Sequence, residues 1–209
     1  MTTTSAPPRL ADFAGKGYVP PVKTYRFRDM RVLAFDQTLK HTGVVDVVFR
    51  GTNIEVMNHK TLTFDHDLAG NAAVLQAATL YYEPIRSEIV IHFGFTAGTN
   101  PDIILFEQPP LANKVIRPES AMMAGLCIKL VCYRAGFPCE MVQAQRTKTD
   151  WAANARATKA QVKRGILEKL PHLKGQMVKA TEHEWDALAL AMTYALNEVG
   201  EAGGSPAHD

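Results

Sequence analysis

Cysteines and long apolar runs are scarce in this sequence. Its three cysteines, Cys127, Cys132 and Cys139, are an odd number and lack the spacing of a metal site. Cys127 and Cys132 fall in an apolar stretch that should be helical, so we expect buried free thiols in a reducing cytoplasm. The chain opens without a basic segment followed by an apolar run, and no apolar run is long enough to span a bilayer. We therefore expect neither a signal peptide nor a membrane segment.

A large excess of charge of either sign is also missing. The 23 basic and 21 acidic residues leave a net charge of +2, so composition alone does not indicate a nucleic-acid binder. The charges are nevertheless uneven, because only Asp150 and Glu168 oppose nine basic residues between Met141 and Ala180. Such a block suits a polyanionic substrate, and a solvated helix face is an equally weighted alternative. The nine are Arg146, Lys148, Arg156, Lys159, Lys163, Arg164, Lys169, Lys174 and Lys179.

No repeat and no linker divides the chain, and its 209 residues fit one domain with a sizeable core. Hydrophobic residues make up 46% and charged residues 21%, as in an ordinary globular protein. Residues 1–26 are rich in Thr, Pro, Gly and Lys, which predicts an irregular extension. Residues 200–209 predict a disordered tail. We expect a single domain over residues 27–199.

Three apolar segments near the amino end are typical of strands, at about residues 30–37, 44–50 and 52–62. Short turns containing Gly43 and Gly51 join them. Sequential strands with short turns predict an antiparallel meander.

A helix is expected next. Asp65 or Asp67 offers an N-cap, and residues 68–78 continue with helix-forming residues. Pro84 should kink or restart the helix. Residues 88–93 are ambiguous between helix and strand, and we favour helix.

The second half of the chain predicts strands that alternate with helices. Residues 103–107 are short and apolar, the pattern of a buried parallel strand. The segments that follow are a helix at 118–135, a strand at 139–144, a basic helix at 152–170 and a last helix at 182–199. This order predicts an α/β fold, with a five-stranded mixed sheet (a three-strand antiparallel meander plus two parallel strands) flanked by helices.

Carboxylates stand at the ends of two apolar strands. Asp36 closes the first strand, and Glu107 directly follows Ile103–Phe106. For Asp36 alone, turn capping is the favoured interpretation. Glu107 is harder to explain in that way, because a carboxylate beside a core is costly unless it is paired or metal-bound. Acids that converge at one end of a sheet would suit divalent cations such as Mg²⁺, two of which can clamp a phosphodiester.

His183 and Asp186 open the last helix and, three residues apart, share one of its faces. Compensation of the helix dipole accounts for Glu182 and Glu184. Asp186 differs because it precedes the apolar ladder 187–192, so its face points toward the protein. We therefore favour His183 and Asp186 as members of a metal site over a surface or core histidine.

Taken in order, three motifs resemble the RuvC family of Holliday junction resolvases, a family with a ribonuclease-H-like fold. The family's pattern is an Asp closing the first strand, a Glu-Gln pair closing the fourth, and Asp-x-x-Asp-Ala-Leu-Ala opening the last helix. The resemblance covers about residues 30–197, in the right order and spacing. The motifs are Phe35-Asp36-Gln37-Thr38 with Thr42-Gly43, then Phe106-Glu107-Gln108, then His183-Glu184-Trp185-Asp186-Ala187-Leu188-Ala189-Leu190-Ala191.

The resemblance implies a Mg²⁺-dependent endonuclease that resolves four-way DNA junctions, with Mn²⁺ able to substitute. Two metal ions would activate a water and stabilise the leaving oxygen. The residues that would hold them are Asp36, Glu107, His183 and Asp186. Lys159 lies in a segment that resembles the family's Lys-x-Gln-Val, and Lys148 falls where the family carries another active-site lysine.

Partners are implied as well. A junction has two-fold symmetry and needs two cuts, so we expect a C₂ homodimer, with the apolar helical residues 121–126 as a candidate interface. Basic residues would hold the DNA backbone without reading its sequence. They are Arg146, Lys148, Arg156, Lys159, Lys163 and Arg164.

The chain also departs from the family's pattern. His183 replaces the first acid of the final pair, and it could ligate a metal or act as a base. Pro110 stands where members often carry an aromatic wedge. Trp151 could stack on an unpaired base, although a packed tryptophan is favoured. These differences predict a divergent, phage-encoded member with altered junction selectivity.

Two rival functions remain open, and the length of the chain argues against a third. A debranching or transposase-like nuclease would share the acids without the preference for junctions. A junction-binding protein could keep the fold and lose the chemistry. An actin-like ATPase or sugar kinase shares the opening strand-Asp-turn-strand, but it needs a second such half and a glycine-rich phosphate loop, for which the chain is too short.

Overall fold

One mixed sheet forms the centre of the protein. The computed structural model describes residues 25–64, 71–94, 100–108 and 118–202, so Asp65, Asp67, Pro110 and most of the expected N-terminal extension lie outside the described residues. The five strands are ordered β3-β2-β1-β4-β5. They are β1 (Phe27–Gln37), β2 (His41–Gly51), β3 (Asn53–Thr63), β4 (Ile103–Gln108) and β5 (Cys139–Gln143).

The pairing of the strands confirms the predicted topology. β1 pairs with β2, and β2 with β3, in antiparallel register. β1 pairs with β4, and β4 with β5, in parallel register. Because β1, β4 and β5 run in the same direction, their carboxyl ends meet at one edge of the sheet.

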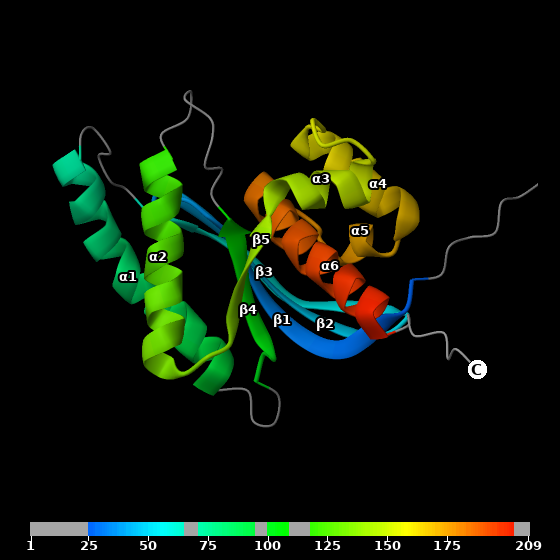
Figure 1. Ribbon diagram of the computed structural model, residues 1–209, viewed down its shortest axis with the longest axis horizontal. Coiled ribbons are helices and arrows are strands. Elements are labelled where there is room, and N and C mark those ends of the chain that lie inside the picture. The colour runs from blue at the N-terminus through cyan, green and yellow to red at the C-terminus, as the bar shows by residue number, and fades with distance from the viewer. Residues whose placement is uncertain (1–24, 65–70, 95–99, 109–117, 203–209) are drawn as a thin grey trace, which may run out of the picture.

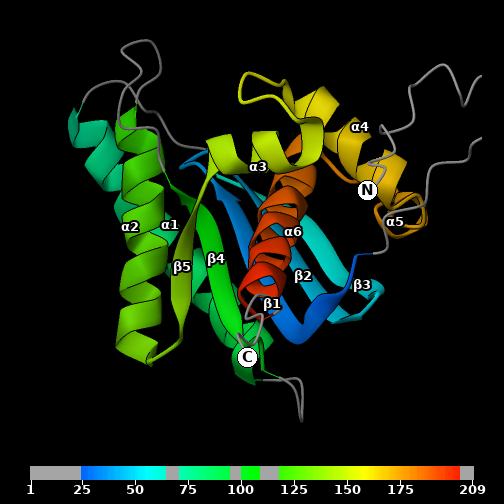
Figure 2. The ribbon, with the colours of Figure 1, turned by 45° about the vertical axis from the view of Figure 1, so that its right-hand side comes forward.

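Helices cover both faces of the sheet (Figures 1 and 2). On one side lie α1 (Asn71–Gly94) and α2 (Pro118–Ala135), which pack on a core that includes Leu33 and Phe35 of β1. The intervening residues Val32 and Ala34 face the other core, because successive strand residues point to opposite faces. The helices of that second side are α3 (Ala144–Ala152), α4 (Lys159–Lys169), α5 (Leu173–Gln176) and α6 (Glu182–Ala202).

The prediction of one basic helix over residues 152–170 is wrong. α3 starts at Ala144 and ends where Ala153 adopts a left-handed conformation, with φ of 52°. α4 then starts after Thr158, whose hydroxyl accepts from the backbone N–H of Gln161. The Gln161 side chain accepts in return from the backbone N–H of Thr158, which completes a capping box. Within this segment Lys159, Lys163, Arg164 and Lys169 lie on α4, and Arg156 lies on the connection between α3 and α4.

Pro84 lies inside α1 and does not restart the helix, which excludes one of the two predicted effects, and residues 88–93 are helical, as favoured. Tyr81, Ile85 and Ile89 form a buried stripe at four-residue spacing, so packing holds the helix on both sides of the proline. Pro84 itself is exposed, where water can satisfy the carbonyl it leaves unpaired.

Two further expectations have different outcomes. Cys127 and Cys132 are buried free thiols, as predicted. α6 continues to Ala202, so the first three residues of the predicted tail are helical. None of the described helices has the length and apolar character that crossing a membrane requires.

Candidate functional site

Asp36 and Glu107 come together because β1 and β4 are parallel neighbours. Phe35 pairs with Phe106, so the carboxylates that follow lie side by side at the carboxyl edge of the sheet. The buried side chain of Gln37 fixes Glu107 further: its amide donates to the Glu107 carbonyl at 2.7 Å and accepts from the Glu107 N–H at 2.9 Å. Gln37 was not among the predicted site residues. Its only signal is a polar residue at a strand end, which a turn would also explain.

The amino end of α6 is pressed against β2 and β3. A Cβ atom on Gly43 of β2 would lie 2.1 Å from the carbonyl oxygen of His183, so only glycine permits this approach. Glu184 is buried and accepts hydrogen bonds from His59 and, at 2.7 Å, from Thr61, both on β3. These hydrogen bonds hold the pKa of Glu184 below its usual value, although its burial acts in the opposite direction. The same contacts set the position of His183 and Asp186.

The structure brings most of the predicted site residues into one pocket of about 140 Å³. Asp36 comes from β1, Glu107 from β4 and Asp186 from α6, while Lys148 and Lys159 enter from α3 and α4. The other lining residues are Ala144, Thr147, Val162, Ala189 and Leu190. The site therefore has an acidic side, two ammonium groups and an apolar wall.

His183 stands beside the pocket and donates from Nδ1 to Oδ2 of Asp36 at 2.7 Å. This bond raises the pKa of His183, although partial burial opposes the shift. The ring of His41 stacks on His183 with 5.6 Å between centroids, a neighbour that the sequence did not reveal. Lys159 forms an ion pair with Asp186.

Like charges crowd around Glu107. Burial, the charge of Asp36, a hydrogen bond with Asp36 and the charge of Asp186 together raise the pKa of Glu107 to about 8. Burial and the charge of Asp36 also raise the pKa of Asp186. Burial tends to lower the pKa of Lys159, but its bond to Asp186 and the nearby carboxylates raise it overall. A carboxylate whose ionisation is opposed by its neighbours marks a place where a cation would be stabilised.

The chemistry of these donors fits a hard divalent cation, which prefers carboxylate oxygens. As the side chains stand, however, no three His, Cys, Asp or Glu residues of the described ranges are grouped closely enough to hold a metal ion. Lys159 and His183 instead balance the charges of Asp186 and Asp36. The residues therefore suit such a cation in chemical type, but a metal ion could bind only after the side chains rearrange and Lys159 releases Asp186.

The other predicted DNA contacts lie outside the pocket. Arg146 and Arg156 are exposed on α3 and on the connection that follows it. Lys163 places its Nζ 4.5 Å from the ring centroid of Trp185, and Arg164 forms an exposed pair with Glu168 at 3.5 Å.

Trp151 is buried and packed, as the sequence favoured. Only 2% of the residue is exposed, and its Nε1 donates to the hydroxyl of Thr193 at 3.1 Å. The alternative, in which this ring stacks on an unpaired base, is wrong for the described structure because the ring has no free face to offer.

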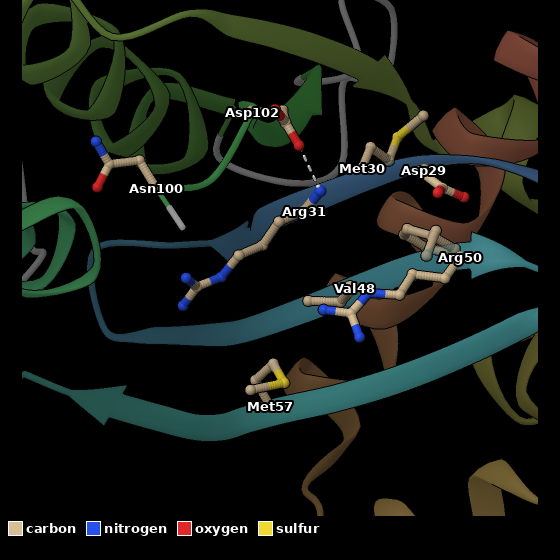
Figure 3. A pocket seen from close by; sticks show the side chains of 9 residues that line it. Asp29, Met30, Arg31, Val48, Arg50, Met57, Asn100 and Asp102 are labelled. Carbon is tan, nitrogen blue, oxygen red and sulfur yellow. Dashed lines mark hydrogen bonds between the residues drawn. The ribbon is translucent and has the colours of Figure 1, made fainter. Parts of the chain in front are cut away.

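A second, larger pocket of about 400 Å³ lies at the opposite end of β1 (Figure 3). No predicted site residue lines it. Three of its charged side chains already have partners: the Arg31 guanidinium pairs with Asp46, Asp102 accepts from the backbone N–H of Arg31 at 2.7 Å, and Asp29 accepts from the N–H of Gly51 at 3.0 Å.

Comparison with protein-family models finds no match, and comparison with curated protein sequences finds none either. Solved structures do match. The chain is similar to RuvC of T. thermophilus in complex with a Holliday junction substrate, with a TM-score of 0.61 and 18% identity over 82% of this chain and 96% of that one. It is also similar to the yeast mitochondrial Holliday junction resolvase Ydc2, with a TM-score of 0.53 and 12% identity over 85% and 82% of the two chains. The protein therefore has the RuvC-like, ribonuclease-H-like fold that its motifs predict.

Proposed function

We propose that this protein is a Mg²⁺-dependent, structure-selective DNA endonuclease that resolves Holliday junctions. The observation that carries the proposal is the convergence of Asp36, Glu107 and Asp186, from three separate elements, on one pocket that also contains Lys148 and Lys159. Of two solved structures with the same fold, one is in complex with a Holliday junction substrate and the other is named as a Holliday junction resolvase, which favours a branched DNA substrate.

Each side chain of the site has a role in this proposal. When bound, Mg²⁺ held by the three carboxylates and His183 would activate water and stabilise the leaving oxygen. The ammonium groups of Lys148 and Lys159 would offset negative charge on the phosphate. Mn²⁺ would substitute for Mg²⁺, because it accepts the same oxygen ligands.

Supporting residues hold this arrangement in place. Gln37 fixes the backbone at Glu107, and Asp36 orients the imidazole of His183 through Nδ1. Such contacts keep the reacting groups in position before the substrate arrives. The exposed Arg146, Arg156 and Arg164, and Lys163 over the ring of Trp185, would bind the sugar–phosphate backbone without reading sequence.

We also propose a homodimer, since paired cuts across a two-fold junction need two sites. α2 carries an exposed apolar stripe, with Met122, Leu126 and Leu130 at 42%, 55% and 42% exposure and spacings of four residues. A stripe of this kind is self-complementary when two copies of one helix meet about a two-fold axis. Leu126→Glu should convert the dimer to a monomer in sedimentation velocity, and a wild-type protein that is monomeric at all concentrations would contradict the proposal.

The direct test is cleavage of labelled DNA. A four-way junction, a Y-fork and a linear duplex of matched sequence are incubated with the protein, with and without Mg²⁺. We expect symmetric nicks in the junction that require Mg²⁺. Equal cleavage of the Y-fork would indicate a broader debranching nuclease. Binding without cleavage in either Mg²⁺ or Mn²⁺ would indicate a non-catalytic junction-binding protein.

A further inference from the structure

Thr147 of α3 carries a hydroxyl without a partner. The residue is 7% exposed and lines the pocket that contains Asp36, Glu107 and Asp186, and its Oγ1 forms no hydrogen bond. A buried hydroxyl that stays unpaired costs free energy, so such groups are uncommon and often occur where function requires them.

The neighbouring threonine shows what is unusual. Thr149, exposed on the same helix, donates from its hydroxyl to the carbonyl of Gln145, four residues earlier, at 3.0 Å. This bond is the ordinary solution for a threonine inside a helix. The equivalent carbonyl for Thr147 is that of Gln143, and its hydroxyl does not use it. The threonine that faces the pocket is thus the one that leaves its hydroxyl unsatisfied.

Thr147 also differs from the other residues of the pocket. The ten lining residues comprise three carboxylates, two lysines, four apolar residues and this single neutral hydroxyl. A hydroxyl both donates and accepts, so it can direct a hydrogen bond without changing the charge of the site. Threonine populates two χ1 rotamers in a helix, and rotation of this side chain breaks no existing hydrogen bond.

We propose that Thr147 is a substrate-binding residue, whose hydroxyl turns into the pocket and donates a hydrogen bond to a phosphate oxygen of the bound DNA strand. An anionic oxygen is the strongest acceptor for such a donor. Lys148, the next residue of the same helix, and Lys159 supply the positive charge that draws a phosphate to this place. The inference rests on the proposed function and adds one specific contact to it.

A structural explanation competes with this one. Oδ2 of Asp150, three residues further along α3, is also buried without a partner. A water shared by Thr147 and Asp150 would satisfy both groups and make the hydroxyl part of the fold. The two explanations predict opposite changes in stability when the hydroxyl is removed.

The test compares three variants. Thr147→Val replaces the hydroxyl by a methyl group of similar shape, Thr147→Ser keeps the hydroxyl, and Thr149→Val is the control that removes a hydroxyl from the same helix outside the pocket. Tm is measured in EDTA, and single-turnover cleavage of a four-way junction is measured over a range of protein concentrations in Mg²⁺.

We expect Thr147→Val to have an unchanged or higher Tm but a roughly 10- to 100-fold lower kcat/KM, the value of a hydrogen bond to a charged group. Thr147→Ser should recover most of the loss, and Thr149→Val should cleave like the wild type. A Thr147→Val variant that cleaves normally would overturn the inference. A fall in its Tm that Thr147→Ser restores would do the same, in favour of the shared water.

Failure of the inference can be told apart from failure of the proposed function. If the wild type cleaves junctions and Thr147→Val cleaves equally well, only the inference fails. If the wild type binds junctions without cutting them, the contact is tested by the dissociation constant in Ca²⁺, which Thr147→Val should raise roughly tenfold. If the wild type neither binds nor cuts, both fail.

Discussion

The two ends of β1 treat buried charge in opposite ways. Arg31, near the start of the strand, is 7% exposed, and Asp36, near its end, is 5% exposed. The guanidinium of Arg31 donates from Nε and Nη2 to the two oxygens of Asp46, at 2.9 and 2.6 Å, a matched bidentate pair on the neighbouring strand. Asp36 instead faces Glu107 and Asp186, so carboxylates are gathered beside one another.

This difference distinguishes charges that stabilise the fold from charges that we assign to the proposed active site. At the first end, opposite charges cancel and contribute to a defined register between β1 and β2. At the second, burial and the like charges of Asp36 and Asp186 raise the pKa of Glu107 to about 8, an arrangement that folding alone would not favour. Local conflict of this kind is expected where a protein binds or reacts. If this distinction holds, mutations should affect the two ends separately.

The largest expected effect is loss of cleavage at the crowded end. Asp36→Asn or Glu107→Gln should reduce Mg²⁺-dependent junction cleavage by at least roughly 100-fold, because each removes a charged ligand while keeping its shape. Junction binding in a gel-shift assay should be retained or strengthened, since negative charge near the DNA falls. Glu55→Gln, on the exposed side of β3, is the matched control and should cleave like the wild type. Full cleavage by either site variant would remove that residue from the ligand set.

At the end of β1 where Arg31 pairs with Asp46, we expect a mutation to change stability but not cleavage. Arg31→Met should lower the free energy of unfolding by about 3–5 kcal/mol in urea titrations, because it leaves Asp46 buried without its charge partner. The double variant Arg31→Met with Asp46→Leu should recover much of the loss. Cleavage per folded molecule should match the wild type, and a specific loss of activity would show that the two ends are coupled.

Glu107 should also make the metal-free protein less stable in alkali. Its pKa is raised from an ordinary value of 4.5 to about 8 in the folded protein, so between these values the folded state holds the extra proton. Stability therefore falls as pH rises through this window. Glu107→Gln should be more stable than the wild type at pH 8.5, by on the order of 2 kcal/mol, and nearly equal at pH 5. Chemical denaturation in EDTA measures both, and equal stabilities at pH 8.5 would argue against crowding of the carboxylates.

The smallest effect is expected at His183. If this side chain serves as a ligand, His183→Asp should keep cleavage within roughly tenfold of the wild type, because a carboxylate can take the same place. The measurement is the cleavage rate against Mg²⁺ concentration, with circular dichroism as the control for folding. A well-folded variant that has lost activity would instead assign proton transfer to the imidazole.

Sequence reasoning succeeded where the signal is local and repeated. The apolar run Val32–Phe35 indicates a buried strand and the pattern of Pro118–Ala135 indicates a helix, and the structure has β1 and α2 at these places. The order of the strands and helices along the chain was enough to predict the mixed sheet. Sequence reasoning failed at the basic segment 152–170. α3 ends there at Ala153, which is in a left-handed conformation, and the sequence has no glycine at this place to indicate the end of a helix.

By itself the sequence determined the strands, the main helices and the acids that close them, since hydrophobic period and a polar residue at a strand end are readable along the chain. Only the tertiary structure decided which groups meet. Gln37 holds the backbone of Glu107 seventy positions away. Gly43 admits His183, and Thr147 keeps its hydroxyl unpaired beside the acids. These relations depend on packing between elements distant in sequence, which no local period encodes.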